Sequence, residues 1–247
     1  MQSDLREFLI FKSDLYEHPN FIASDPIQIP KKFSQREDIE IVAFLVATIA
    51  WGNRQSIIKS GEKLVRIMGN SPYDFIMNYK PRKAHEFVHR TFNTQDLHYF
   101  FSALKHIYLN GGLEQQFKAP TENLKSRIVG FRKEFLSSNT EARTKKHVSN
   151  PETGAAAKRL VMFLRWMVRS NAKGVDFGIW KSISPSELYI PLDIHTGNIA
   201  RKLGILHRNQ NDWKANEELR DVFLKIDPSD PARFDFALFG LGAFEKF

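Results

Sequence analysis

The sequence predicts an all-α fold, and two observations lead to this prediction. Apolar residues recur at helical spacing through most of the 247 residues, and segments with the alternation of a β-strand are hard to find. The breaks between helical segments carry residues that end and begin helices. An Asn-Gly-Gly run at 110–112 ends one helix, and Asp-Pro pairs at 227–228 and 230–231 separate two others.

The expected helices follow in chain order. The N-terminal segment mixes charges with Leu5, Phe8 and Leu9 and predicts an amphipathic helix. Helical periodicity then covers residues 38–50, 54–69, 95–109, 121–137, 154–170, 194–205, 212–226 and 231–245. Two stretches resist the helical pattern, 17–35 and 137–154, and we expect them to be exposed loops.

Composition favours a polyanionic partner. The formal charge is +8 and the isoelectric point about 9.6, with Lys and Arg spread along the chain, so nucleic acid is the leading candidate. The absence of cysteine excludes disulfides, thiolate nucleophiles and cysteine-ligated zinc or iron–sulfur sites. Dinucleotide-binding, Walker and EF-hand patterns are missing, so we expect no cofactor.

Nothing in the sequence indicates a membrane. The N-terminal segment lacks the uninterrupted apolar core of a signal peptide, and the longest apolar run, residues 39–51, contains an acid and is too short to cross a bilayer. We therefore expect a cytoplasmic protein with no membrane partner, and we infer no protein partner.

One formal metal motif occurs. Residues 85–89 read HEFVH, a pattern that on a helix presents two imidazoles to zinc and a glutamate to water. Pro81 leaves little helix ahead of the motif, the neighbouring lysines and arginines oppose a dication, and Glu114 is the one third ligand to nominate. We expect a surface helix with two histidines and no metal site, with an H-E-x-x-H zinc hydrolase kept as an alternative.

The stretch IPLDIHTGNIARKLGIL at 190–206 places an acid where an amphipathic helix begins. Asp193 precedes Ile199 and Leu203, which recur at roughly helical spacing, so its carboxylate lies at or beside a helix start. One interpretation is a helix cap, and the other is a catalytic acid at the mouth of a cleft. His195 either orients this acid or is a structural histidine.

The segment GAAAKRLVMFLRWMVRS at 154–170 predicts an amphipathic helix with Lys158, Arg165 and Arg169 on a shared strip. Small residues before Lys158 leave its side chain open to the close approach of a ligand or another backbone. The alternative is an ordinary exposed lysine on the polar face of the helix.

Three separated segments together resemble the helix-hairpin-helix DNA glycosylase superfamily, whose best-known member is endonuclease III. Residues 40–65 look like its opening helix pair, with the polar break WGNRQ between the helices. Residues 191–206 resemble its Asp-x-His helix start, and residues 223–244 its proline-rich turn and following helix. The interval from Lys158 to Asp193 looks closer to the archaeal 8-oxoguanine glycosylase branch. Over nearly its full length the chain also resembles a bacterial family, domain of unknown function 2400.

The resemblance implies one compact unit, residues 1–247, with a two-lobed fold. Residues 37–185 would form a central helical lobe, and residues 1–36 and 186–247 a second lobe built from both termini. A damaged base flipped out of duplex DNA would enter the cleft between the lobes.

The same resemblance implies a site. Lys158 would attack the sugar as nucleophile and Asp193 would stabilise its positive charge, giving a DNA glycosylase with abasic-site lyase activity. Residues expected to contact the substrate or DNA are Trp51, Asn53, Arg54, Arg143, Lys145, Lys146, Arg165, Trp166, Arg169, His195 and Arg201, with Trp180 as a further pocket residue.

The sequence also departs from the family pattern. The Leu-Pro-Gly-x-Gly hairpin that holds a DNA phosphate has no copy, and the family's lysine a short step before the acid is absent. Lys173 and Lys181 remain alternative nucleophiles. A non-catalytic nucleic-acid-binding protein, in which Asp193 only caps its helix, is therefore the competing hypothesis.

Overall fold

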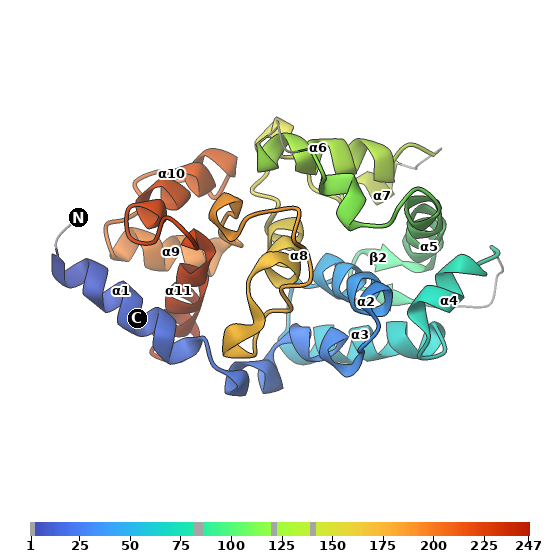
Figure 1. Cartoon of the computed structure of the whole chain (residues 1–247), viewed down its shortest axis with the longest axis horizontal. Helices are drawn as coiled ribbons and strands as arrows, with labels where there is room; N and C mark the ends of the chain where they lie inside the picture. Colours follow the sequence, from blue (N-terminus) through green and yellow to red (C-terminus); the bar gives the residue numbers. More distant parts are fainter. Residues whose placement is uncertain (1–2, 82–85, 120–122, 139–141) are drawn as a thin grey trace. The chain divides into compact units, whose positions relative to one another are not determined.

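The computed structural model describes residues 3–81, 86–119, 123–138 and 142–247 (Figure 1). It divides the chain into a terminal unit, residues 1–23 and 150–247, and a central unit, residues 24–149. Both chain ends therefore belong to the same unit. The boundaries, after Ala23 and Ser149, differ from the expected ones after residues 36 and 185, because two segments pack differently from the expectation.

The predicted all-α class is confirmed. The terminal unit contains α1 (Ser3–Tyr16), α8 (Lys158–Val168), α9 (Ile194–Lys202), α10 (Trp213–Leu224) and α11 (Phe234–Ala243). The central unit contains α2 (Arg36–Thr48), α3 (Arg54–Ile67), α4 (Pro72–Met77), α5 (Thr94–Leu109), α6 (Leu124–Phe135) and α7 (Ala142–Lys145). Within the described residues the one sheet is an antiparallel hairpin of β1 (Val88–His89) and β2 (Phe92–Asn93), which the sequence did not predict.

Helix α11 lies at the centre of the terminal unit, where it packs against α1 and α9 (Figure 1). Its buried Leu238 joins a core that includes Leu9 of α1 and Ile199 of α9. Gly240 permits the close approach of α1, because a Cβ atom at this position would lie 2.0 Å from Cδ2 of Tyr16.

Helix α8 belongs to the terminal unit because its arginines bind acids from other parts of that unit. Arg169 is 3% exposed, and its Nη1 lies 2.7 Å from Asp176 Oδ2 while its Nη2 lies 2.8 Å from Glu17 Oε1. Nη2 also contacts Asp230 Oδ2 at 2.7 Å. A buried guanidinium is costly without such partners, so the network holds residues after 150 in this unit and joins the end of α1 to α8.

Phenylalanines form the core of the central unit. Phe44 of α2, Phe100 of α5 and Phe131 and Phe135 of α6 are each at most 1% exposed. The Phe135 ring centroid lies 5.2 Å from that of Phe44 and 4.9 Å from that of Phe100, in edge-to-face geometry. These contacts join α2, α5 and α6.

The first expected loop, residues 17–35, is not simply exposed. Short 3-10 turns that begin at prolines run through it, and Ile27 and Ile29 are fully buried. Ile29 packs so closely on α3 that a Cβ atom on Gly61 would lie 2.3 Å from its Cδ1. The expectation was wrong because two buried isoleucines are too few to produce a periodic pattern. Their packing places the second part of this segment, residues 24–35, in the central unit.

The second expected loop, between α6 and α8, is anchored where the structure describes it. Thr144 Oγ1 donates to Oδ1 of the fully buried Asp96 at 2.7 Å, and His147 Nε2 lies 3.3 Å from Asp96 Oδ2. Lys145 and Lys146, between these anchors, are exposed. Residues 144–147 are therefore a fixed segment with an exposed basic tip.

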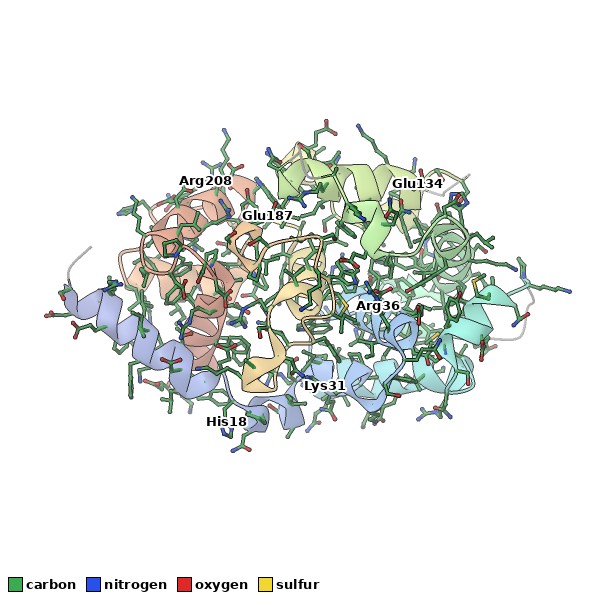
Figure 2. The ribbon with its side chains drawn as sticks, in the orientation of Figure 1. His18, Lys31, Arg36, Glu134, Glu187 and Arg208 are labelled. Atoms are coloured by element: carbon green, nitrogen blue, oxygen red, sulfur yellow. The ribbon has the colours of Figure 1, made fainter. Side chains whose placement is uncertain are left out.

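Arg36, labelled in Figure 2, shows how ion pairs join elements of the central unit. Its Nε lies 2.9 Å from Oε1 of the buried Glu40, and its Nη2 binds Glu114. Glu40 Oε2 also accepts a hydrogen bond from Tyr108 at 2.8 Å. Glu114, nominated above as a third zinc ligand, is thus engaged in an ion pair.

We expect Gly240→Ala to lower the free energy of unfolding by about 1–3 kcal/mol, because the added methyl group meets the Tyr16 ring. Urea unfolding measures the change. Gly130→Ala in α6 is the matched control, since a Cβ there meets no atom within 4 Å. That substitution should raise the stability by about 0.4–1 kcal/mol. Equal effects at the two glycines would contradict the assigned contact between α1 and α11.

Candidate functional site

The structure brings together the two residues expected to be catalytic. Lys158 is the first residue of α8, and Asp193 is the residue immediately before α9. Lys158 Nζ donates a hydrogen bond to Asp193 Oδ2 at 2.7 Å. The side chains are 34% and 29% exposed, respectively, so solvent and a ligand can reach the pair.

Asp193 uses both carboxylate oxygens. Oδ1 accepts the backbone N–H of Thr196 at 2.9 Å, which confirms the predicted helix cap, while Oδ2 binds Lys158. Burial acts to raise the pKa of Asp193, but the charge and hydrogen bond of Lys158, together with the Thr196 amide, outweigh it. The pKa therefore lies below its ordinary value, and Asp193 is a carboxylate at neutral pH.

The chain before Lys158 is held in an unusual conformation. The helix expected from residue 154 begins only at 158, because Gly154 and Ala157 have φ angles of 91° and 50° and cannot be helical. Trp213 N donates to Gly154 O at 2.8 Å, and Ala155 pairs with Asp212 in an isolated β-bridge. These contacts fix the backbone from which Lys158 projects.

Sequence reasoning missed a second acid near the pair. Asp235, in the first turn of α11, is 7% exposed and binds Arg165 of α8. Burial, with a further contribution from the charge of Asp193, raises the pKa of Asp235 to about 6 although Arg165 and Lys158 oppose this. The residue was missed because it lies 70 positions from Arg165, in an apolar segment without a recognisable motif.

We expect Asp235 to make the protein less stable as pH rises from about 4 to 6. An unfolded aspartate releases its proton near pH 3.8 and the folded Asp235 near 6, so the folded state binds more protons in this window. The free energy of unfolding then falls by about 3 kcal/mol across it. Urea unfolding at several pH values measures this fall, and Asp235→Asn should remove it. A variant that keeps the whole slope would exclude this titration.

Most of the other expected contact residues of the terminal unit lie inside it. Trp166 is fully buried, and Arg165 and Arg169 are each 3% exposed and bound to acids. Arg201 donates hydrogen bonds to Asn211 Oδ1, at 2.6 Å, and to the backbone carbonyls of Arg208 and Asn209. His195 is the exception, because it is exposed two residues after Asp193.

The remaining pocket and nucleophile candidates are also occupied. Trp180 is 1% exposed and its ring meets Phe163 edge-on. Lys173 pairs with Asp14, and Lys181 Nζ donates to the backbone oxygen of Gly178. Of the lysines considered from the sequence, Lys158 is the one bound to Asp193.

In the central unit, the expected contact residues lie on two neighbouring segments. The Trp51 ring stacks on His147, with centroids 5.9 Å apart. The WGNRQ break therefore meets residues 143–147, which carry Lys145 and Lys146 and which we call the basic segment. Asn53 is exposed and caps α3 through Ser56 N. Arg54 is half-buried and lies 3.3 Å from the Ser24 hydroxyl.

The structure does not support the HEFVH zinc motif. His85 lies outside the described residues, and His89 is on strand β1 rather than on the expected surface helix. His89 is 3% exposed, with Nδ1 at 2.9 Å from Ser60 Oγ and Nε2 at 3.3 Å from Trp51 O. Burial lowers its pKa. Over the residues that the structure describes, no group of three acids or histidines is arranged to hold a metal.

The fold and the site define an all-helical protein with a part-exposed lysine–aspartate pair where two helices begin. The chain belongs to the family described as "Protein of unknown function (DUF2400)", whose sequence profile matches residues 25–244. Comparison with curated proteins and with solved structures gave no match. Among the helices that the structure describes, none is both long and apolar enough to cross a membrane.

Proposed function

We propose that this protein is a DNA base-excision glycosylase with abasic-site lyase activity, in which Lys158 is the nucleophile and Asp193 its acidic partner. The 2.7 Å contact between Lys158 Nζ and Asp193 Oδ2, at a place that solvent reaches, carries the proposal. Breaking a glycosidic bond builds positive charge on the sugar, which a carboxylate stabilises and an amine captures.

The chemistry needs both groups. The amine attacks C1′ of a flipped nucleotide while the C1′–N bond breaks and its electron pair leaves with the base. The proton that the amine releases passes through Asp193 to the departing base, so Asp193 is a carboxylate again when positive charge develops on the sugar. Ring opening then gives a Schiff base between Lys158 and C1′. Loss of a C2′ proton expels the 3′ phosphate and cuts the strand.

The charge of the whole chain supports a nucleic-acid substrate. A formal charge of +8 attracts a polyanion, and exposed lysines of the central unit offer contacts to phosphate groups. His195, exposed beside Asp193, offers a further contact in the terminal unit.

We expect borohydride to trap a covalent adduct between the wild-type chain and duplex DNA that contains an abasic site, 8-oxoguanine or uracil. Lys158→Ala should form no adduct, because the amine that makes the Schiff base is gone. Gel electrophoresis of labelled duplexes measures the yield. Lys173→Ala is the matched control, because this lysine pairs with Asp14 and not with Asp193, and its adduct yield should equal that of the wild type. An adduct that survives Lys158→Ala would refute the assignment of the nucleophile.

A non-catalytic nucleic-acid-binding protein is the second candidate, and one observation favours it. Asp193 Oδ1 caps α9 through Thr196 N, which is sufficient reason for an aspartate at this position. Salt-sensitive binding of duplexes, with no adduct and no cleavage on any of the three lesions, would establish this alternative.

Two substitutions at Asp193 separate the cap from the chemistry. Asn caps helices as well as Asp, so Asp193→Asn should keep most of the stability, whereas Asp193→Ala should lose about 1 kcal/mol of unfolding free energy. For the enzyme, both should slow adduct formation by at least about 100-fold, since both remove the carboxylate. Urea unfolding and trapping rates measure the two effects. An Asp193→Asn variant that traps DNA as fast as the wild type would contradict the proposed chemical role of Asp193 and leave only its role as a helix cap.

A further inference from the structure

Three segments of the central unit meet around the hairpin of β1 and β2. The Trp51 ring centroid lies 5.3 Å from that of His89 on β1 and 5.9 Å from that of His147 after α7. Arg143 of α7 donates from Nη2 to the carbonyl oxygen of Thr91 in the hairpin turn, at 3.1 Å. We call the exposed residues of these segments the hairpin surface: Gly52, Asn53, Val88, Arg90, Thr91, Lys145 and Lys146.

Hydrogen bonds and an ion pair to less exposed residues fix the hairpin surface in place. Arg143 Nη1 donates to Asn93 Oδ1 at 2.6 Å, and its Nη2 lies 3.3 Å from the buried Asp96. Asp96 also accepts the Thr144 hydroxyl, and His89 is hydrogen-bonded to α3 through Ser60. Arg143 and Asp96 therefore fix the hairpin and the basic segment to each other and to the start of α5.

Arg90 occupies a special position at the hairpin turn. Its φ angle is 55°, in the left-handed region that non-glycine residues seldom adopt. Its guanidinium lies over Gly52, where a Cβ atom would be 2.7 Å from Nη1. Arg90 makes no hydrogen bond or ion pair with another residue that the structure describes. The turn thus presents a positioned cation to which no acid among the described residues is bound.

The exposed charged side chains of these three segments are mostly positive. Arg90, Lys145 and Lys146 are exposed, and in the described parts of these three segments Glu86 is the one exposed acid. Val88, two residues from Arg90, is 68% exposed and supplies the apolar surface of the hairpin. Fixed cations around a small apolar tip are complementary to the phosphates and sugars of a nucleic-acid backbone.

We propose that the hairpin surface binds the backbone of duplex DNA, with Arg90 and Lys145 on phosphates and Val88 against a sugar. The proposal rests on the proposed nucleic-acid function, and it adds a binding surface centred on a hairpin that the sequence did not reveal. Phosphate contacts position a protein on DNA without reading its sequence.

The test is binding of the full chain to a short undamaged duplex, measured by fluorescence anisotropy from about 0.05 to 0.3 M salt. Arg90→Gln and Lys145→Gln should each lower the slope of log K against log salt concentration by about one, and weaken binding about eightfold at 0.1 M salt. Val88→Ser should weaken binding with an unchanged slope, because it removes an apolar contact and no charge.

Lys133→Gln in α6 is the matched control, because it removes an exposed charge outside the three segments. A slope for Lys133→Gln that falls as much as for Arg90→Gln would overturn the proposal in favour of diffuse attraction by the net charge. Wild-type slope and affinity in Arg90→Gln, Lys145→Gln and Val88→Ser would also overturn it, and unfolding curves show that each variant is folded.

The same measurements separate this proposal from the proposed function. Duplex binding that survives all three substitutions refutes the hairpin surface alone, and the trapping experiment on Lys158 is unaffected. A wild-type chain that binds no duplex at any salt concentration refutes both. Binding that needs Arg90 and Lys145, without any trapped adduct, supports the hairpin surface in a non-catalytic protein.

Discussion

The terminal unit depends on the compensation of positive charge along α8. Lys158, Arg165 and Arg169 succeed one another at intervals that keep them near one face, and the two arginines are almost wholly buried. Each buried guanidinium needs carboxylates, and these come from several parts of the chain: Glu17, Asp176, Asp230 and Asp235. Because these pairs fix the rotation and position of α8, they also fix where Lys158 lies relative to Asp193.

The arginines of α8 show what the sequence reveals and what it hides. Periodicity correctly places Arg165 and Arg169 on a strip with Lys158, but the same pattern is typical of a surface that binds DNA and of a helix that buries ion pairs. Two of the acids that bind Arg169, Asp230 and Glu17, lie 61 and 152 positions from it, separations that no local pattern records. Burial of a charge is settled by tertiary contacts, and for this reason the helix could be predicted while the setting of its arginines could not.

Elements were predictable where the local pattern is long. Helices such as α2, α3, α5 and α9 follow from their apolar spacing, and the cap at Asp193 from an acid placed just before such a pattern. The hairpin was not predictable, because strands of two residues each are too short to show alternation. Its stability comes from contacts such as Arg143 with Thr91, which join residues about 50 positions apart. Helices α4 and α7 were not predicted either, because they too are short.

The two units differ in how they use the chain. The central unit is one continuous stretch, whereas the terminal unit joins α1 to α11, with Ser13 Oγ donating to the carbonyl of Arg233 at 3.0 Å across 220 positions. During synthesis on the ribosome, residues 24–149 are therefore all made before the second part of the terminal unit, residues 150–247. Helix α1 is made well before α11, and until then the helix against which it packs is absent. Helix α1 thus waits for a partner made more than 200 residues later, and a nascent chain released before α11 would expose its apolar face.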